Sequence, residues 1–147
     1  MLRTMTSRAI LLGFTLFTLA ACSDDEAAPS GHGTPVSTKL FDVATGSELP
    51  APYQLPAGAT TRVEVRFYDA DGGLLNAELE ASHFTSVTFT PAEFATVADV
   101  EGQKFQRDVT VTAAAGATAA LAVGYGHDAA ADEESFGPYD VVAAAAP

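Results

Sequence analysis

The sequence is poor in cysteine, tryptophan and basic residues. It has one cysteine and no tryptophan, and seven Lys and Arg residues stand against 19 Asp and Glu, for a formal net charge of −12. A single cysteine leaves no internal disulfide, so apolar packing must supply the stability. A surface this acidic repels phosphate backbones, so we expect no nucleic-acid partner.

Catalytic motifs are missing as well. No serine stands in a nucleophile-elbow sequence, and no glycine-rich phosphate loop follows a predicted strand. The one thiol that could act as a nucleophile is Cys22, which belongs to an N-terminal segment with a different role. We therefore expect the protein not to be an enzyme.

The first residues have the three parts of an export signal. Arg3 and Arg8 make the start positive, and no acidic residue occurs before Asp24. Residues 10–21 form an apolar run of about a dozen residues, shorter than the ~20 that a membrane-spanning helix needs. The run ends in Leu19-Ala20-Ala21-Cys22, which resembles the lipobox of bacterial lipoproteins.

The resemblance to lipoproteins implies how the chain is processed. Residues 1–21 would be removed as a signal peptide, and the thiol of Cys22 would carry the lipid that anchors the protein in a membrane. The alternative is an ordinary cleavable signal with an incidental cysteine. An unpaired thiol in an oxidising compartment invites intermolecular pairing, which argues against that alternative.

The residue after the cysteine bears on the location. Ser23 stands where an Asp favours retention in the inner membrane in the best-known lipoprotein sorting pattern. The resemblance therefore implies the bacterial cell envelope, with an outer-membrane anchor and a domain that is periplasmic or surface-exposed. Removal of the signal takes away two of the seven basic residues and none of the 19 acidic ones, which leaves a net charge of about −14.

Composition divides the mature chain into two parts. Residues 22–35 are acidic and rich in Gly, Pro and Ser, without hydrophobic periodicity, and we interpret them as a lipidated flexible tether. Residues 36–147 have enough Val, Leu, Phe and Tyr for the core of one domain. The sequence thus predicts a signal peptide, a tether and a single folded domain.

The folded domain alternates apolar and polar residues with a period of two. In 62–68, Val63, Val65 and Phe67 fall on one face, and in 105–113 we expect Phe105, Val109 and Val111 to point inward. No segment has a convincing helical period. This pattern predicts an all-β antiparallel sandwich. The predicted strands are 36–44, 62–68, 74–80, 84–89, 95–97, 105–113, 118–125 and 139–143.

Part of this pattern resembles bacterial Ig-like domains. The run LPAGATTRVEV at 55–65 and the turn at 69–72 look like the opening hairpin of that family, and 95–97 and 115–123 look like its closing strands. The resemblance implies an Ig-like β-sandwich of about seven or eight strands. The chain departs from the family in having one copy rather than a tandem array, and Phe89 in place of a central-strand tryptophan.

One stretch, 124–139, concentrates groups that could bind a metal ion. It places one imidazole and several carboxylates in a predicted strand-to-strand loop, and His83 precedes a strand that could lie nearby. Oxygen ligands suit Ca²⁺, whereas histidine with carboxylate suits Zn²⁺ or Cu²⁺. The alternative is a solvated acidic turn, because the spacing matches no known metal motif. The candidate ligands are His83, His127, Asp128, Asp132 and Glu133, with Glu134 beside them.

Two functional hypotheses remain open at this stage. The first is a non-enzymatic module, anchored in the membrane through Cys22, whose Ig-like domain presents loops or an edge strand to a protein or envelope partner. The second is a periplasmic metal-binding lipoprotein that uses His83, His127 and the acidic loop 128–134.

Overall fold

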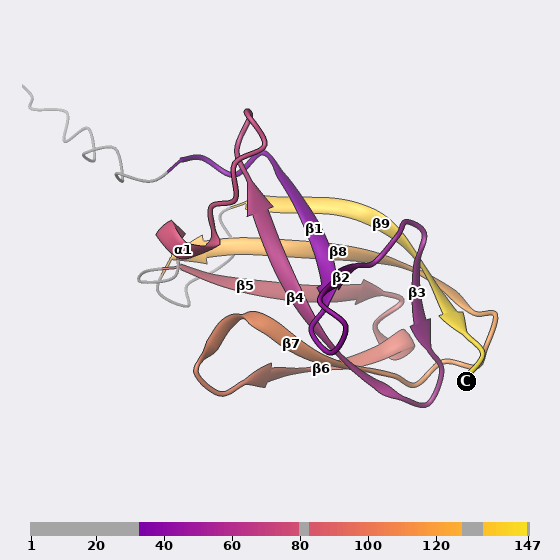
Figure 1. Ribbon diagram of the computed structural model, residues 1–147. Helices are drawn as coiled ribbons and strands as arrows, with labels where there is room; N and C mark the ends of the chain where they lie inside the picture. Colours follow the sequence, from indigo (N-terminus) through magenta and orange to yellow (C-terminus); the bar gives the residue numbers. More distant parts are fainter. Residues whose placement is uncertain (1–32, 80–82, 128–133, 147) are drawn as a thin grey trace, which may run out of the picture.

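Two β-sheets face each other in the computed structural model, which describes residues 33–79, 83–127 and 134–146 (Figure 1). Between them, these residues form nine strands, one short α-helix and one 3₁₀ turn. None of the helices in these ranges is long and apolar enough to cross a membrane. The elements are β1 Ser37–Asp42, β2 Ser47–Glu48, β3 Tyr53–Pro56, β4 Thr60–Tyr68, α1 Asn76–Leu79, β5 His83–Thr90, η1 Ala92–Phe94, β6 Ala95–Val100, β7 Gln103–Val111, β8 Thr118–His127 and β9 Glu134–Ala144.

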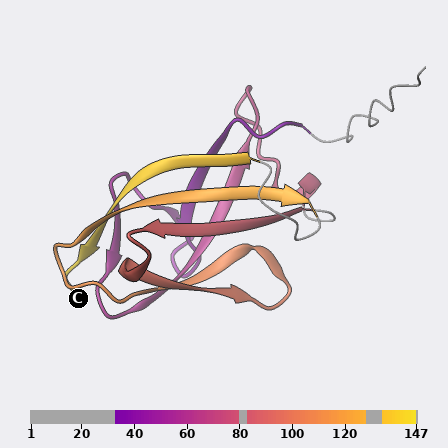
Figure 2. The same cartoon turned by 180° about the vertical axis from the view of Figure 1, so that it is seen from behind.

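The strand order identifies the type of sandwich. One sheet has the order β2-β1-β4-β7-β6, and the other, which faces the viewer in Figure 2, has the order β3-β9-β8-β5. All strand pairs are antiparallel except β3 with β9. The strands β1, β4, β7 and β6 take the places of A, B, E and D in a constant-type Ig domain, and β5, β8 and β9 those of C, F and G. The predicted all-β sandwich is confirmed.

The strand count exceeds the predicted seven or eight for a local reason. The first predicted strand, 36–44, shortens to β1, and a two-residue strand, β2, folds back against it. The chain then crosses to the opposite sheet, where β3 runs parallel to β9. Residues 55–65, which resemble an opening hairpin, therefore belong to β3 and β4 in different sheets. That hairpin prediction was wrong.

Strand β4 shows why period-two alternation gave the correct prediction. Val63, Val65 and Phe67 are at most 1% exposed, and they point between the sheets. The residues between them lie on the outer face, where Arg62 and Glu64 form ion pairs with neighbouring side chains. A strand with one face in the core and one in water needs this alternation.

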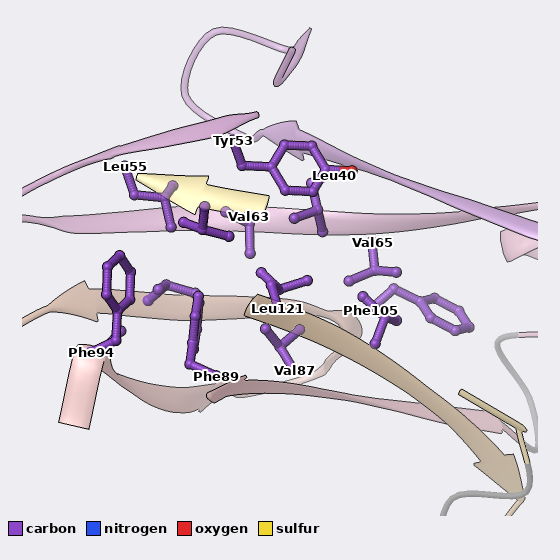
Figure 3. Close-up of a cluster of buried hydrophobic side chains, with 14 of the residues drawn as sticks. Leu40, Tyr53, Leu55, Val63, Val65, Val87, Phe89, Phe94, Phe105 and Leu121 are labelled. Carbon is purple, nitrogen blue, oxygen red and sulfur yellow. The ribbon is translucent and has the colours of Figure 1, made fainter. Parts of the chain in front are cut away.

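The core lies between the two sheets and is held together by apolar contacts. Figure 3 shows Leu40, Val63 and Val65 pointing toward Val87 and Leu121 from the other sheet. Further along, the fully buried ring of Phe67 lies 5.3 to 5.9 Å from three aromatic rings, measured between centroids. These distances are typical of favourable aromatic pairs. The three rings are Phe105, Tyr125 and Phe136.

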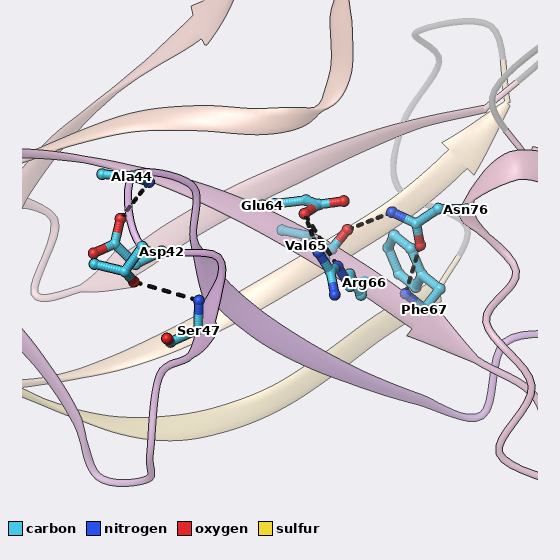
Figure 4. Close-up of polar contacts among 9 residues, drawn as sticks. Asp42, Ala44, Ser47, Glu64, Val65, Arg66, Phe67 and Asn76 are labelled. Atoms are coloured by element: carbon cyan, nitrogen blue, oxygen red, sulfur yellow. Dashed lines mark hydrogen bonds and ion pairs between the residues drawn. The ribbon is translucent and has the colours of Figure 1, made fainter.

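The segment 74–80 is not the predicted strand. Leu74 makes one isolated bridge to Tyr68, and the chain then turns into helix α1. Asn76 explains the change: its side chain accepts a hydrogen bond from the Phe67 amide (2.8 Å) and donates one to the Val65 carbonyl (2.7 Å; Figure 4). The register of β4 with β7 ends at Glu64, so one side-chain amide replaces a neighbouring strand there.

This bridge predicts a specific loss of stability. Replacing Asn76 by Ala leaves a buried donor and acceptor of β4 without partners, which we expect to lower the free energy of unfolding by about 1–3 kcal/mol. Urea denaturation followed by circular dichroism measures the change. Asn76→Asp keeps the acceptor for the Phe67 amide but turns a carboxylate oxygen toward the Val65 carbonyl, so we expect it not to restore the stability. An Asn76→Ala protein as stable as the native chain would contradict this role.

Candidate functional site

The histidines predicted as metal ligands lie side by side in the sheet. His83 begins β5 and His127 ends β8, and the two are directly paired in the antiparallel register. Three of the other predicted ligands, Asp128, Asp132 and Glu133, lie outside the described residues, as does Cys22. The structure therefore brings together the backbone positions of the two histidines.

His83 is the first residue of β5, and its side chain is buried. Its side chain is 1% exposed, and its ring stacks on the ring of Tyr125 with centroids 5.1 Å apart and planes 13° from parallel. The ring nitrogen Nδ1 lies 2.5 Å from the carbonyl oxygen of Leu79. Since a carbonyl only accepts, Nδ1 carries the proton, and in the neutral ring the lone pair is on Nε2.

The carboxylates show a different arrangement from the one the sequence suggested. Glu134, predicted to lie in a loop, is the first residue of β9, is exposed and pairs in register with Tyr125. The final strand was predicted near 139–143, but it starts five residues earlier and brings Phe136 against Phe67. Across residues 33–79, 83–127 and 134–146, no three His, Cys, Asp or Glu side chains gather as metal ligands.

A second feature lies close to His83, at the side of the sandwich where β5 and β6 are both edge strands. β5 pairs with β8 and β6 with β7, and neither has another neighbour among the described strands. The turn η1 joins them at one end, and toward the other end a cleft of about 680 Å³ opens between the two sheets. Its walls include Phe84–Val87 from β5, Val97, Asp99 and Val100 from β6, and Gly102–Lys104 from the turn into β7.

Arg107 of β7 lies at the floor of this cleft and is 7% exposed. One terminal nitrogen, Nη1, donates to the carbonyl oxygens of Lys104 (3.0 Å) and Gln106 (2.6 Å). The other, Nη2, donates to the carbonyl oxygen of Thr85 in β5. Arg107 thus connects the two sheets by side-chain to main-chain hydrogen bonds.

The charge of Arg107 has one carboxylate close to it. Nε lies 3.1 Å from Oδ1 of Asp99, whose side chain is 89% exposed. Burial lowers the pKa of the guanidinium, and the nearby Asp99 raises it by a smaller amount. Because arginine stays protonated in proteins, a positive charge persists at the floor of the cleft.

The sequence contained a signal for Arg107 that the prediction passed over. Phe105, Val109 and Val111 were expected to point inward, and all three are buried. Arg107 occupies the inward position between Phe105 and Val109 in the same alternation. A basic residue in an inward position of a strand has to meet polar groups in the interior, which marks it as unusual.

The other two arginines in the described part of the chain, Arg62 and Arg66, lie on the outer face of the β2-β1-β4-β7-β6 sheet. Arg62 makes a two-point contact with its cross-strand partner Asp108, from Nε to Oδ1 (2.8 Å) and from Nη2 to Oδ2 (2.9 Å). Arg66 pairs with Glu64 and also covers the ring of Phe41. Both of these arginines have their charge matched by a carboxylate on the outer face, in contrast to Arg107.

The Arg62–Asp108 pair predicts a pH dependence. The guanidinium holds the pKa of Asp108 below its ordinary value of 3.8. A depressed pKa in the folded state contributes stability above the unfolded value, and this contribution is lost as pH falls through the folded value. We expect Arg62→Gln to raise the pKa of Asp108 toward 3.8 in an NMR titration, and to reduce the stability difference between pH 6 and pH 3. An unchanged Asp108 pKa would contradict the assignment.

The comparisons with known proteins leave the family unassigned. Protein-family models, curated proteins and solved structures were each compared with the chain, and none matches it. The function of this chain therefore has to be argued from the geometry of the cleft and the histidine pair.

Proposed function

We propose that this protein is a non-enzymatic binding module of the bacterial cell envelope, anchored by lipid on Cys22, which captures an extended segment of a partner at its open edge. The observation that carries the proposal is that two edge strands, β5 and β6, lie on either side of one cleft. An extended peptide adds readily to an exposed sheet edge, because main-chain groups supply affinity and side-chain pockets supply specificity.

The size and lining of the cleft support binding of this kind. Its volume of about 680 Å³ is within the range of about 300–1,000 Å³ typical of ligand sites. Half-buried Val97 and Val100 supply apolar wall, and exposed Gln103 and Lys104 lie at the turn between β6 and β7. Natural proteins usually cover or charge a sheet edge that has no partner. An edge beside a cleft is therefore a surface suited to a binding partner.

The anchor belongs to the same proposal. A lipid on Cys22 and the tether 22–35 would hold the domain near a membrane, where local concentration compensates for modest affinity. We expect labelled palmitate to be incorporated into the native chain expressed in a bacterium and not into a Cys22→Ser variant. Incorporation that persists in Cys22→Ser would overturn the anchor at this residue.

The edge-binding proposal is tested with peptides. A displayed library of random peptides is selected on the mature chain, residues 22–147 with Cys22→Ser. We expect selected peptides to bind the native cleft, to lose at least tenfold in affinity with Val97→Lys, and to retain affinity with Thr96→Lys. Val97 lines the cleft, whereas the adjacent Thr96 is exposed and does not. A melting curve checks that both variants fold. Equal binding to the two variants, or no selected peptide, would contradict the proposal.

A second candidate function, metal binding, is favoured by the direct pairing of His83 with His127. Nδ1–H of His83 donates a hydrogen bond to a backbone carbonyl. A hydrogen bond of this kind usually orients a histidine that binds metal through Nε2. The chemistry of two imidazoles suits Zn²⁺ or Cu²⁺, and Ca²⁺ would need the carboxylates of the acidic segment.

Metal binding has its own test. The metal-stripped chain is melted with increasing Zn²⁺, Cu²⁺ or Ca²⁺, and a specific site at 100 times its Kd would stabilise the fold by about 2.7 kcal/mol. We expect His127→Ala to abolish the shift caused by Zn²⁺ or Cu²⁺. Because His83 is part of the core, His83→Ala is compared by its metal-dependent shift and not by its melting temperature alone. The absence of a shift with all three ions would exclude this function.

A further inference from the structure

Arg107 is an unusual residue to find buried in this chain. The protein has seven basic residues against 19 acidic ones, yet one arginine lies 7% exposed at the floor of the cleft. A buried charge is costly unless it is paired and hydrogen-bonded. Three backbone carbonyls accept hydrogen bonds from its terminal nitrogens, but they carry only partial charge. A carboxylate is therefore still needed to balance the positive charge of the guanidinium.

The carboxylate that is present matches Arg107 poorly. Asp99 approaches from one side, at Nε, and its side chain is almost fully in water. A carboxylate this exposed contributes little to an ion pair, because solvent screens its charge. The Arg62–Asp108 pair of the same protein shows what a matched partner looks like, with two parallel N–H···O contacts. Asp99 therefore resembles a partner that another carboxylate could displace.

The groups around Arg107 indicate which edge an incoming chain can use. The carbonyl oxygen of Thr85 in β5 already accepts a hydrogen bond from Arg107. Arg107 therefore already occupies a main-chain acceptor on the edge of β5, and β6 is the edge that an incoming chain can follow. Val97 and Val100 of β6 and Val87 of β5 make the wall beside it apolar. A ligand that fits has an extended backbone, apolar side chains and one negative end.

We propose that the cleft binds the free C-terminus of an extended, apolar peptide, whose terminal carboxylate pairs with Arg107 in place of Asp99 while its backbone follows β6. This inference rests on the proposed edge-binding function and names the chemistry of the ligand. The strongly acidic chain disfavours a peptide with many carboxylates. A single terminal carboxylate on an apolar segment avoids that repulsion and still supplies the charge at the floor.

Two matched peptide libraries separate the proposal from the broader function. Random peptides are displayed in one library with free C-termini and in the other with both ends fused, and both are selected on residues 22–147 with Cys22→Ser. We expect enrichment from the free-end library alone, with apolar final residues. Enrichment from both libraries would overturn the carboxylate inference and leave edge binding in place. Enrichment from neither would overturn both.

Point variants then test Arg107 itself. The most enriched peptide is synthesised as the acid and as the C-terminal amide, and both are titrated by calorimetry. We expect the amide, and the acid with Arg107→Lys, to bind roughly 10- to 100-fold more weakly, because a charge-assisted hydrogen bond is lost or misaligned. Equal affinity for acid and amide would overturn the proposal.

Arg107 variants can fail to fold, so a surface variant provides a second measurement. Asp99→Asn removes the competing carboxylate at an exposed position, and we expect it to strengthen binding of the acid several-fold without changing the amide. Asp108→Asn is the control, because it removes the same charge on the outer face, where it contacts Arg62. Equal effects of the two substitutions would indicate a general charge effect and overturn the role of Arg107.

Discussion

The packing of Phe67 between the two sheets is the contact on which the rest of the structure depends. In antibody domains a disulfide joins strands B and F across the core. Here the corresponding strands β4 and β8 are joined by the rings of Phe67 and Tyr125, because the chain has no cysteine pair. Burial of an aromatic ring stabilises without a covalent link, provided that the surrounding side chains fill the space. The bridge from Asn76 secures the end of β4 where Phe67 lies, so the ring and its strand are fixed together.

The two lateral sides of the sandwich differ, and the difference creates the candidate site. On one side the chain crosses from β2 in one sheet to β3 in the other, and β3 is paired with β9. On the other side η1 joins β5 and β6 at one end, and the cleft opens toward the other. Arg107 crosses this opening to reach Thr85, so the sheets are tied there by a polar contact in place of apolar packing. The hydrogen bond between the sheets places a charged group beside the cleft, which apolar packing would not do.

The cleft and the histidine pair are neighbours, since Thr85 lines the cleft two residues after His83. The proposed peptide site and the proposed metal site would therefore share strand β5. The outer face of the opposite sheet contrasts with this end of the molecule. There Lys39, Arg62 and Arg66 each meet a carboxylate at the surface. These surface pairs offer no buried charge to a ligand.

The sequence by itself determined the fold class, the strand at 62–68, and the inward positions of Val63, Val65 and Phe67, because alternation with a period of two is a local property. It also supplied the expectation of a lipidated Cys22, which depends on a short linear motif. Only the tertiary structure decided that residues 76–79 would form a helix, because the hydrogen-bonding needs of Phe67 and Val65 are met by a residue nine or more positions away. The same holds for Arg107: the sequence placed it on the inward side, but its carbonyl partner lies 22 residues earlier, in the opposite sheet. Contacts between sheets depend on how the strands are ordered, and no local pattern in this chain contains that order.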